Sequence, residues 1–187
     1  MRIITGKYKG RRFDIPKTFK ARPTTDFAKE NIFNVMTGYL DFEGINALDL
    51  FAGTGSITLE LLSRGCDRVV SVEKDPAHQR FTKQCLEKIA GEKGSDAEDI
   101  KRVILIKGDV MRFIRSTTHK FDLIFADPPY QLENIAELPE MILSSGILAE
   151  GGLLVFEHGS KNTFKENPLF VEQKVYGSVN FSLFVNK

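Results

Sequence analysis

Short apolar runs alternate with helix-patterned stretches along most of this 187-residue chain, and that alternation limits the folds it can adopt. The expected strands are residues 47–51, 69–73, 103–106, 121–126 and 152–157. The expected helices that follow the first four strands are residues 56–64, 76–89, 110–115 and 135–144. Strands that alternate with helices form right-handed βαβ units and a parallel sheet. We therefore predict an α/β fold of the Rossmann-like, doubly wound type.

Both ends of the chain add elements to this core. Residues 174–185 indicate two strands around Gly177, which would complete a mostly parallel seven-stranded sheet with an antiparallel C-terminal hairpin. Residues 2–5 and 10–15 are expected to form a small N-terminal β-hairpin, followed by a helix that runs to about Leu40. We expect a single domain over 1–187, with 1–20 as a basic hairpin extension and 45–187 as the Rossmann-like core.

Residues 121–130, FDLIFADPPY, give a buried strand a rigid and polar exit. Pro128 and Pro129 stop the strand because proline lacks an N–H donor and fixes φ. Ligands of open α/β sheets bind at the carboxyl ends of the strands, where Asp127 lies. Its carboxylate can accept hydrogen bonds from an exocyclic amine, while Tyr130 can stack on a planar base. Asp-Pro-Pro is also an ordinary strand breaker, so this interpretation depends on the residues at the ends of the other strands.

A glycine loop, DLFAGTGS at residues 49–56, follows the first expected strand and opens a helix. Thr58 stands where a dinucleotide fingerprint would have its third glycine, and no Lys-Ser/Thr pair completes a P-loop. The loop therefore favours a nucleoside cofactor without a pyrophosphate. Glu73 ends the second strand, 18 residues after Gly55, and can accept hydrogen bonds from both ribose hydroxyls. Asp109 follows the third strand and could accept from an adenine amino group.

Charge is distributed unevenly, although the net charge is only +1. Residues 1–22 carry eight Lys or Arg and one acid, a net +7, and the remainder carries −6. A basic arm on an acidic body favours a polyanionic partner, and Tyr8 and Phe13 among the arginines favour nucleic acid. A solvated lysine-rich hairpin is the alternative.

Composition excludes several other classes of protein. A hydrophobic fraction of 42% and a charged fraction of 27% are typical of a soluble globular chain. There is no apolar run near the ~18 residues that a membrane helix needs, and the first residues have no signal-peptide core. Cys66 and Cys85 are expected to be packing residues, and we predict no metal site and a cytoplasmic location.

This ordered set of motifs resembles the S-adenosylmethionine-dependent methyltransferases of the Rossmann-like class. The Asp-Pro-Pro-Tyr sequence is similar to that of the group that methylates amines. Four N-terminal segments narrow the likeness to the bacterial RsmD family, which methylates the N2 amine of one guanine in small-subunit (16S) ribosomal RNA. They are RIITG at 2–6, GRR at 10–12, RPTTD at 22–26 and NIFN at 31–34. The likeness covers nearly the whole chain, and it departs at the polar loop 91–99, which is longer than usual.

The resemblance implies S-adenosylmethionine as the cofactor and a role for each matching residue. The cofactor would be bound by Thr24, Thr25, Asp49, Phe51, Gly53, Gly55, Glu73 and Asp109. The target guanine would be held by the catalytic residues Asp127, Pro128, Pro129 and Tyr130. The RNA backbone would be bound by the arm through Lys7, Arg11, Arg12 and Arg22. The expected partner is small-subunit ribosomal RNA or an assembling small subunit, bound by a monomeric enzyme without a membrane.

Two other classes of function stay open from the sequence. One is an amino-methyltransferase for DNA adenine or a protein amide, although those groups often carry Asn where Asp127 stands, and DNA enzymes usually add a recognition domain. The other is a non-catalytic RNA-binding protein of the same fold, which the set of acids after the strands disfavours. Fold alone decides neither.

Overall fold

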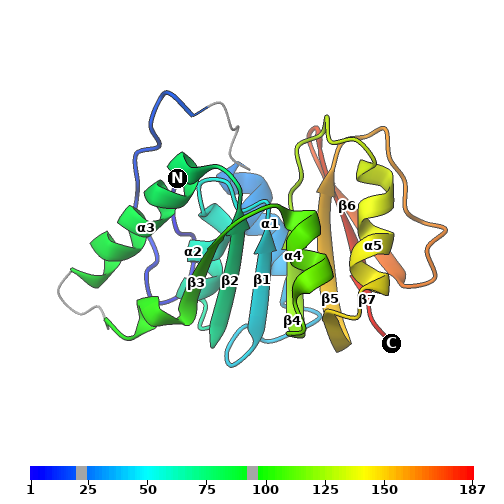
Figure 1. Cartoon of the computed structure of the whole chain (residues 1–187), viewed down its shortest axis with the longest axis horizontal. Helices are drawn as coiled ribbons and strands as arrows, with labels where there is room; N and C mark the ends of the chain where they lie inside the picture. Colours follow the sequence, from blue (N-terminus) through cyan, green and yellow to red (C-terminus); the bar gives the residue numbers. More distant parts are fainter. Residues whose placement is uncertain (20–24, 92–96) are drawn as a thin grey trace.

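A single mixed sheet organises the computed structural model, which describes residues 1–19, 25–91 and 97–187 (Figure 1). The strand order is β3-β2-β1-β4-β5-β7-β6. The parallel strands are β1 (Asn46–Leu50), β2 (Arg68–Glu73), β3 (Val103–Lys107), β4 (Phe121–Ala126) and β5 (Leu148–His158). The antiparallel hairpin β6 (Phe170–Tyr176) and β7 (Val179–Val185) joins the sheet through β7 and β5. The predicted α/β fold with seven strands is confirmed.

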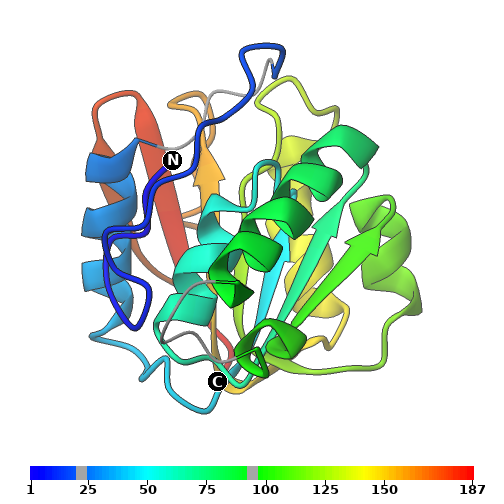
Figure 2. The ribbon, with the colours of Figure 1, turned by 90° about the vertical axis from the view of Figure 1, so that its left-hand side faces the viewer.

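Helices cover both faces of the sheet (Figure 2). On one face lie α1 (Asp26–Met36), α2 (Ser56–Ser63) and α3 (Pro76–Ala90), and on the other lie α4 (Val110–Ser116) and α5 (Leu138–Ser144). Short 3₁₀ turns occupy η1 (Asp99–Arg102) and η2 (Ile135–Glu137). Because successive strand residues point to opposite faces, Leu48 packs with α4 and α5 while Ala47 packs with α1 and α2. The central strands are apolar on both faces for this reason.

Two expectations about the N-terminal region need correction. The arm pairs through one antiparallel bridge, between Arg2 and Arg12, rather than through two regular strands. Its apolar residues instead pack on α2 and α3, where Ile3, Tyr8 and Phe13 are buried. The first helix ends at Met36 and not near Leu40, because Thr37 caps it and the next residue is Gly38.

The two cysteines agree with their prediction as packing residues. Cys66 and Cys85 are both buried, and burial raises the pKa of both thiols to about 12, which suits packing residues. No helix among the described residues is long and apolar enough to cross a membrane. Residues 92–96 of the predicted polar loop lie outside the described part of the chain.

Candidate cofactor and substrate site

The carboxyl ends of four parallel strands meet at one edge of the sheet, where the strand order reverses between β1 and β4. Backbone hydrogen bonds connect the ends across the strands. Asp127 N donates to Leu50 O (3.3 Å), Ala52 N to Val72 O (3.1 Å) and Gly108 N to Glu73 O (3.1 Å). In open α/β sheets such a reversal is the usual place for a ligand. The structure therefore brings together the segments after β1, β2, β3 and β4 that the sequence singled out.

The loop after β1 has a strained, left-handed backbone. Phe51, Gly53 and Gly55 have φ values of 62°, 53° and 76°. Gly55 is also required by packing, since a Cβ there would lie 2.5 Å from Cγ2 of Thr82 in α3. Phe51 is a non-glycine residue in this region, and such outliers cluster at ligand sites.

Glu73 fastens this loop to the end of β2. Its Oε2 accepts from Gly53 N at 2.8 Å, and its Oε1 accepts from Asp75 N at 2.7 Å. The side chain is half-buried. A carboxylate has about four acceptor positions, so two stay open for hydroxyl donors of a ligand.

Asp49 is placed differently from the other acids. It is 1% exposed, and its Oδ2 lies 2.6 Å from the hydroxyl of Thr58 in α2, which in turn lies 2.9 Å from the hydroxyl of Ser71. Burial raises the pKa of Asp49 to about 7, although the Thr58 hydrogen bonds act in the opposite direction. Asp49, which the sequence predicts to line the methionine part of the cofactor, is therefore a buried acid bound to the helix that follows the loop.

Asp109 and Thr25 are exposed helix caps at the same edge. Asp109 Oδ1 accepts from Arg112 N at the start of α4 (2.9 Å), and Thr25 Oγ1 accepts from Ala28 N at the start of α1 (3.2 Å). Each can serve as a cap and still contact a ligand, because each side chain is exposed. Thr24 and Arg22, which the sequence also predicted for the site, lie outside the described residues.

The segment after β4 forms the other half of the site. Asp127 is half-buried, Pro128 is buried and Pro129 is exposed. Tyr130 is 45% exposed and donates its hydroxyl to Glu157 Oε1 at 3.1 Å. Burial and then the charge of Glu157 raise the pKa of Tyr130 well above its ordinary value, so the hydroxyl stays protonated.

Glu157 is a site residue that the sequence analysis did not assign. It ends an apolar stretch of β5, is 5% exposed, and binds the tyrosine of the Asp-Pro-Pro-Tyr segment. The available signal was the same one that singled out Glu73, an acid at the carboxyl end of a parallel strand.

The basic arm is fixed to the body by a buried carboxylate. Glu60 of α2 accepts from Ile4 N (2.7 Å), Thr5 N (3.0 Å) and Arg64 Nε (2.9 Å). Lys29 of α1 is fully buried and donates to Arg2 O (2.6 Å) and to the Ser56 hydroxyl (3.0 Å). Burial lowers the pKa of Lys29.

The predicted RNA-binding side chains of the arm differ in their surroundings. Lys7 Nζ lies 2.7 Å from Asp99 Oδ2, so part of its charge is neutralised. The Arg11 guanidinium lies over the Tyr8 ring at 5.0 Å. Arg12 is exposed, and its backbone forms the bridge to Arg2. These three cations lie on one arm, as predicted.

The residues at this edge fit a cofactor that combines a nucleoside with a cationic group. Carboxylates after β2 and β3 suit hydroxyl and amine donors, and the loop 51–55 holds no Lys or Arg for a pyrophosphate. No group of three His, Cys, Asp or Glu side chains suited to a metal ion occurs among the described residues.

Fold and site together define a class of protein, the Rossmann-like methyltransferases, and the cofactor of this class is the expected S-adenosylmethionine. A family model described as "Conserved hypothetical protein 95" matches residues 1–185. The chain belongs to that family, which is the RsmD family that the sequence resembles.

Two relatives and one solved structure support this assignment, and a second solved structure shares the fold. Proteins named "Ribosomal RNA small subunit methyltransferase D" come from Escherichia coli (strain K12) and Haemophilus influenzae (strain Rd). The Escherichia coli protein is 28% identical to this chain, and the match covers 98% of this chain and 89% of the relative. The Haemophilus influenzae protein is 30% identical, and the match covers 100% of this chain and 94% of the relative. The solved structure of yhhF from Escherichia coli has a TM-score of 0.82 at 26% identity and covers 100% of this chain and 98% of that one. The structure of SMU.776 complexed with SAH has a TM-score of 0.63 at 16% identity, and the match covers 84% of this chain and 49% of that chain. This match is a likeness of fold alone.

Proposed function

We propose that this protein transfers a methyl group from S-adenosylmethionine to the exocyclic N2 amine of a guanine in small-subunit ribosomal RNA. The observation that carries the proposal is the junction of β1 and β4, where Asp127 N binds Leu50 O. This bond holds the start of the Asp-Pro-Pro-Tyr segment beside the end of β1, where the glycine loop begins, and it supports a role for the Asp127 carboxylate close to the bound cofactor. The names of the two relatives support ribosomal RNA as the substrate.

Cofactor binding is assigned to the segments after β1, β2 and β3. Glu73 would hold the ribose hydroxyls and Asp109 the adenine amine. The backbone of Phe51, Gly53 and Gly55 would line the methionine part. Thr25, with Thr24, would close the site from the start of α1, where free amide groups favour a carboxylate. Asp49 would line the same part, held in place by the Thr58 hydroxyl.

Base binding is assigned to the segment after β4. The bound cofactor supplies an electrophilic methyl group, so the chain has to supply position and a proton acceptor. Asp127 and the carbonyl groups near Pro128 and Pro129 accept hydrogen bonds from the N–H groups of the target amine. These bonds direct the nitrogen lone pair, which is otherwise delocalised into the ring. Alignment of this kind contributes much of the rate in two-substrate reactions. Asp127 then receives the proton released when the N–C bond forms and the methyl–sulfur bond of the cofactor breaks, directly or through water.

Tyr130 forms the stacking face for the base. Its hydroxyl donates to the buried Glu157, so the far end of the ring is held in place. A ring fixed in this way loses less entropy when a base stacks on it. The arm, with Lys7, Arg11, Arg12 and Arg22, would bind phosphates on either side of the target.

Methyl transfer in vitro tests the proposal. Purified protein, labelled S-adenosylmethionine and either protein-free small-subunit RNA or assembled small subunits are incubated, and the RNA is digested to nucleosides. The expected product is N2-methylguanosine, formed by the wild type and much more slowly by Asp127→Asn. If the product is N6-methyladenosine, the target base is adenine and not guanine. Cofactor binding without any transfer would favour a non-catalytic RNA-binding protein.

A further inference from the structure

Phe27, in the first turn of α1, is more exposed than any other large apolar side chain described, at 67%. The buried side of α1 is formed by Ala28, Ile32 and Met36, at helical spacing. Phe27 lies off that stripe, and its carbonyl accepts from the side chain of Asn31, one turn further along. Helical periodicity would place a polar residue here, so burial in the core does not account for this phenylalanine.

A second aromatic residue supports Phe27 from below. The rings of Phe27 and Tyr176 lie 6.1 Å apart at an angle of 89°, an edge-to-face contact. Tyr176 is in turn packed on the buried Phe181, with 6.1 Å between ring centroids. Figure 2 shows the start of α1 beside the turn of the β6–β7 hairpin. The pair is therefore an aromatic surface with one exposed and one half-buried ring.

Strand register places this pair at the same edge as the base site. Tyr176 pairs with Val179, and the neighbouring Asn180 pairs with His158 at the end of β5. Glu157, which holds Tyr130, precedes His158. Two strand spacings separate β5 from β6, roughly 10 Å. A nucleotide next to the one held at Tyr130 can reach across that distance.

We propose that Phe27 and Tyr176 form a stacking platform for an unpaired nucleotide that flanks the target guanine in RNA. The proposal rests on the proposed function, because it takes the target base to lie at Asp127 and Tyr130. Stacking on aromatic rings is the common way in which proteins bind single-stranded RNA, since every base has a flat apolar face. One exposed ring supported by a second ring suits one base.

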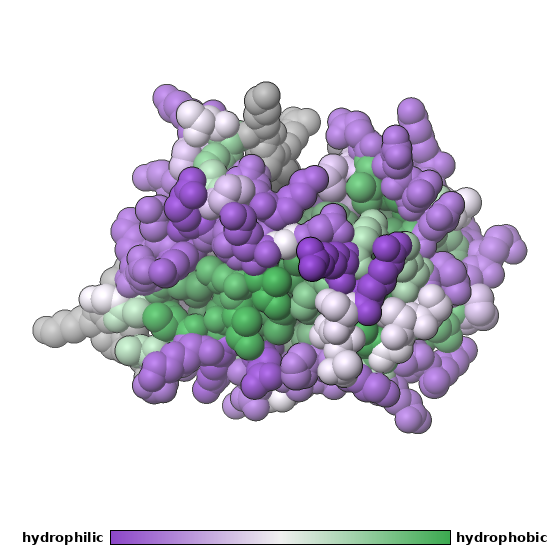
Figure 3. All heavy atoms as spheres, viewed as in Figure 1, coloured by the Kyte–Doolittle hydropathy of each residue, from purple (hydrophilic) through white to green (hydrophobic). Residues whose placement is uncertain are grey.

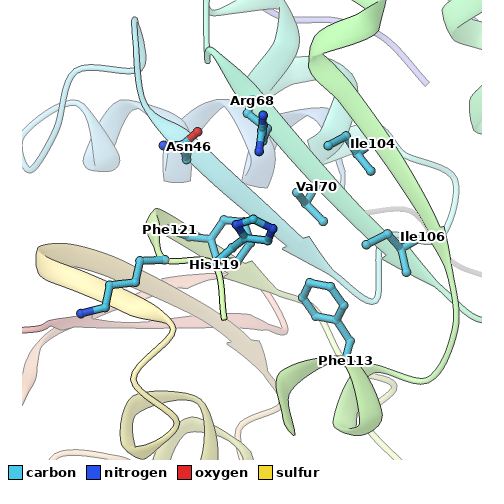
Figure 4. A pocket seen from close by; sticks show the side chains of 9 residues that line it. Asn46, Arg68, Val70, Ile104, Ile106, Phe113, His119 and Phe121 are labelled. Atoms are coloured by element: carbon cyan, nitrogen blue, oxygen red, sulfur yellow. The ribbon is translucent and has the colours of Figure 1, made fainter. Parts of the chain in front are cut away.

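A protein partner fits this surface less well. A stable protein interface needs about 800 Å² on each side, and around Phe27 the side chains of Asn34 and Glu30 are polar and exposed. The apolar groove lined by Val70, Ile104 and Phe113 lies elsewhere, at the opposite end of the strands beside Asn46 and Arg68 (Figures 3 and 4). It offers no continuous surface with Phe27.

The absence of tryptophan from the chain allows a direct test. Phe27→Trp would carry the only indole, so its emission reports on this position alone. An unpaired RNA oligonucleotide containing the target guanine is expected to quench it. The same oligonucleotide with an abasic site in place of the flanking base should quench it much less. Ile104→Trp, on the exposed face of β3, is the matched control and should not respond.

Binding measurements complete the test. Phe27→Ala should bind the oligonucleotide about tenfold more weakly, within the range for one lost stacking contact. Its dependence on salt should equal that of the wild type, because no phosphate contact is removed. If Phe27→Ala binds the oligonucleotide with wild-type affinity, the platform is wrong. If the variant binds only assembled subunits more weakly, the platform is also wrong and the surface contacts a protein.

Failure of the platform and failure of the proposed function give different results. If the wild type forms N2-methylguanosine while the emission of Phe27→Trp does not change on RNA binding, the platform is wrong and the function stands. If that emission is quenched but no guanine is methylated, the reaction is wrong and the RNA-binding surface stands.

Discussion

Four acids end or follow neighbouring strands, and their surroundings give them different roles. Asp49 is buried and bound to Thr58, Glu73 is bound by two backbone amides, and Asp109 caps α4. Asp127 is half-buried and precedes two prolines. The residue type is shared, so the environment decides which carboxylate can take a proton and which can only accept hydrogen bonds.

Asp127→Asn tests the proton acceptor. Asparagine keeps the size and one acceptor but has no negative charge. We expect the rate of methyl transfer to fall by about 100-fold or more, as for the loss of a general base. Single-turnover transfer to small-subunit RNA at saturating cofactor measures it, and cofactor affinity, measured by calorimetry, should stay close to that of the wild type. A wild-type rate would leave Asp127 as a positioning acceptor only.

Glu73→Ala and Glu73→Gln separate two tasks of this residue. Alanine removes the acceptors for Gly53 N and for the ribose, and should weaken cofactor binding by ~1.5–3 kcal/mol, as for a charge-assisted hydrogen bond. Glutamine keeps one oxygen acceptor and should fall between alanine and the wild type. Titration calorimetry measures both, and an alanine variant with unchanged affinity would remove Glu73 from the site.

Asp49→Asn tests the buried acid through the pH dependence of stability. The pKa of Asp49 is raised from 3.8 to about 7, so the folded state binds a proton more tightly than the unfolded state. This contribution to stability is fully present below pH 3.8 and is lost as the pH rises through 7. It amounts to at most roughly 4 kcal/mol for this rise. Asparagine cannot titrate, so the variant should gain stability relative to the wild type between pH 4 and pH 8.

Urea denaturation at a series of pH values gives this comparison, with Asp14→Asn in the exposed arm as the control. Parallel pH profiles for the wild type and Asp49→Asn would show that Asp49 is ionised throughout that range.

Among the elements, the arm differs most from its predicted form. A basic β-hairpin extension was expected from local pattern alone, and the structure shows in addition that Glu60 binds the backbone of Ile4 and Thr5, and Lys29 binds that of Arg2. Removing one partner from a buried ionic network typically costs ~3–5 kcal/mol. The arm is therefore a fixed part of the body, and its cations keep a constant position relative to the sheet edge.

Arg12→Ala tests whether this fixed arm binds RNA. Arg12 is exposed and its loss should not disturb the core. We expect weaker RNA binding, and a plot of log affinity against log salt that is flatter by about 0.7–0.9, the value for one phosphate contact. Binding isotherms over a series of salt concentrations measure the slope, with Lys83→Ala on the outer side of α3 as the control. An unchanged slope would mean that Arg12 is only a solvated charge.

The sequence predicted those features of the elements that local patterns encode. The parallel strands, the glycine loop and the acids after β2 and β3 follow from periodicity and from the residues at strand ends. The docking of the arm could not be predicted in this way, because Glu60 and Ile4 are 56 residues apart and nothing near either residue indicates the other. The contact of Tyr130 with Glu157 was missed for the same reason, since it depends on β4 and β5 being neighbours.

For the whole molecule, one edge of one sheet collects the proposed functional groups. The loops after β1 to β4 and the end of β5 meet there, the start of α1 lies beside them, and the arm is bound to α1 and α2. The contacts of Glu60 and Lys29 support the proposal that residues 1–187 form a single domain. RNA held by the arm and a base held at Asp127 would then be presented to one rigid frame.

The central claim is that this frame methylates the N2 amine of a guanine in small-subunit RNA, and nucleoside mass mapping of that RNA tests it most directly. RNA from a strain lacking the gene is compared with RNA from the same strain carrying the wild-type or the Asp127→Asn gene. The account predicts that one N2-methylguanosine disappears, returns with the wild-type gene, and stays largely absent with the variant. An unchanged set of methylated guanines in the strain lacking the gene would contradict it.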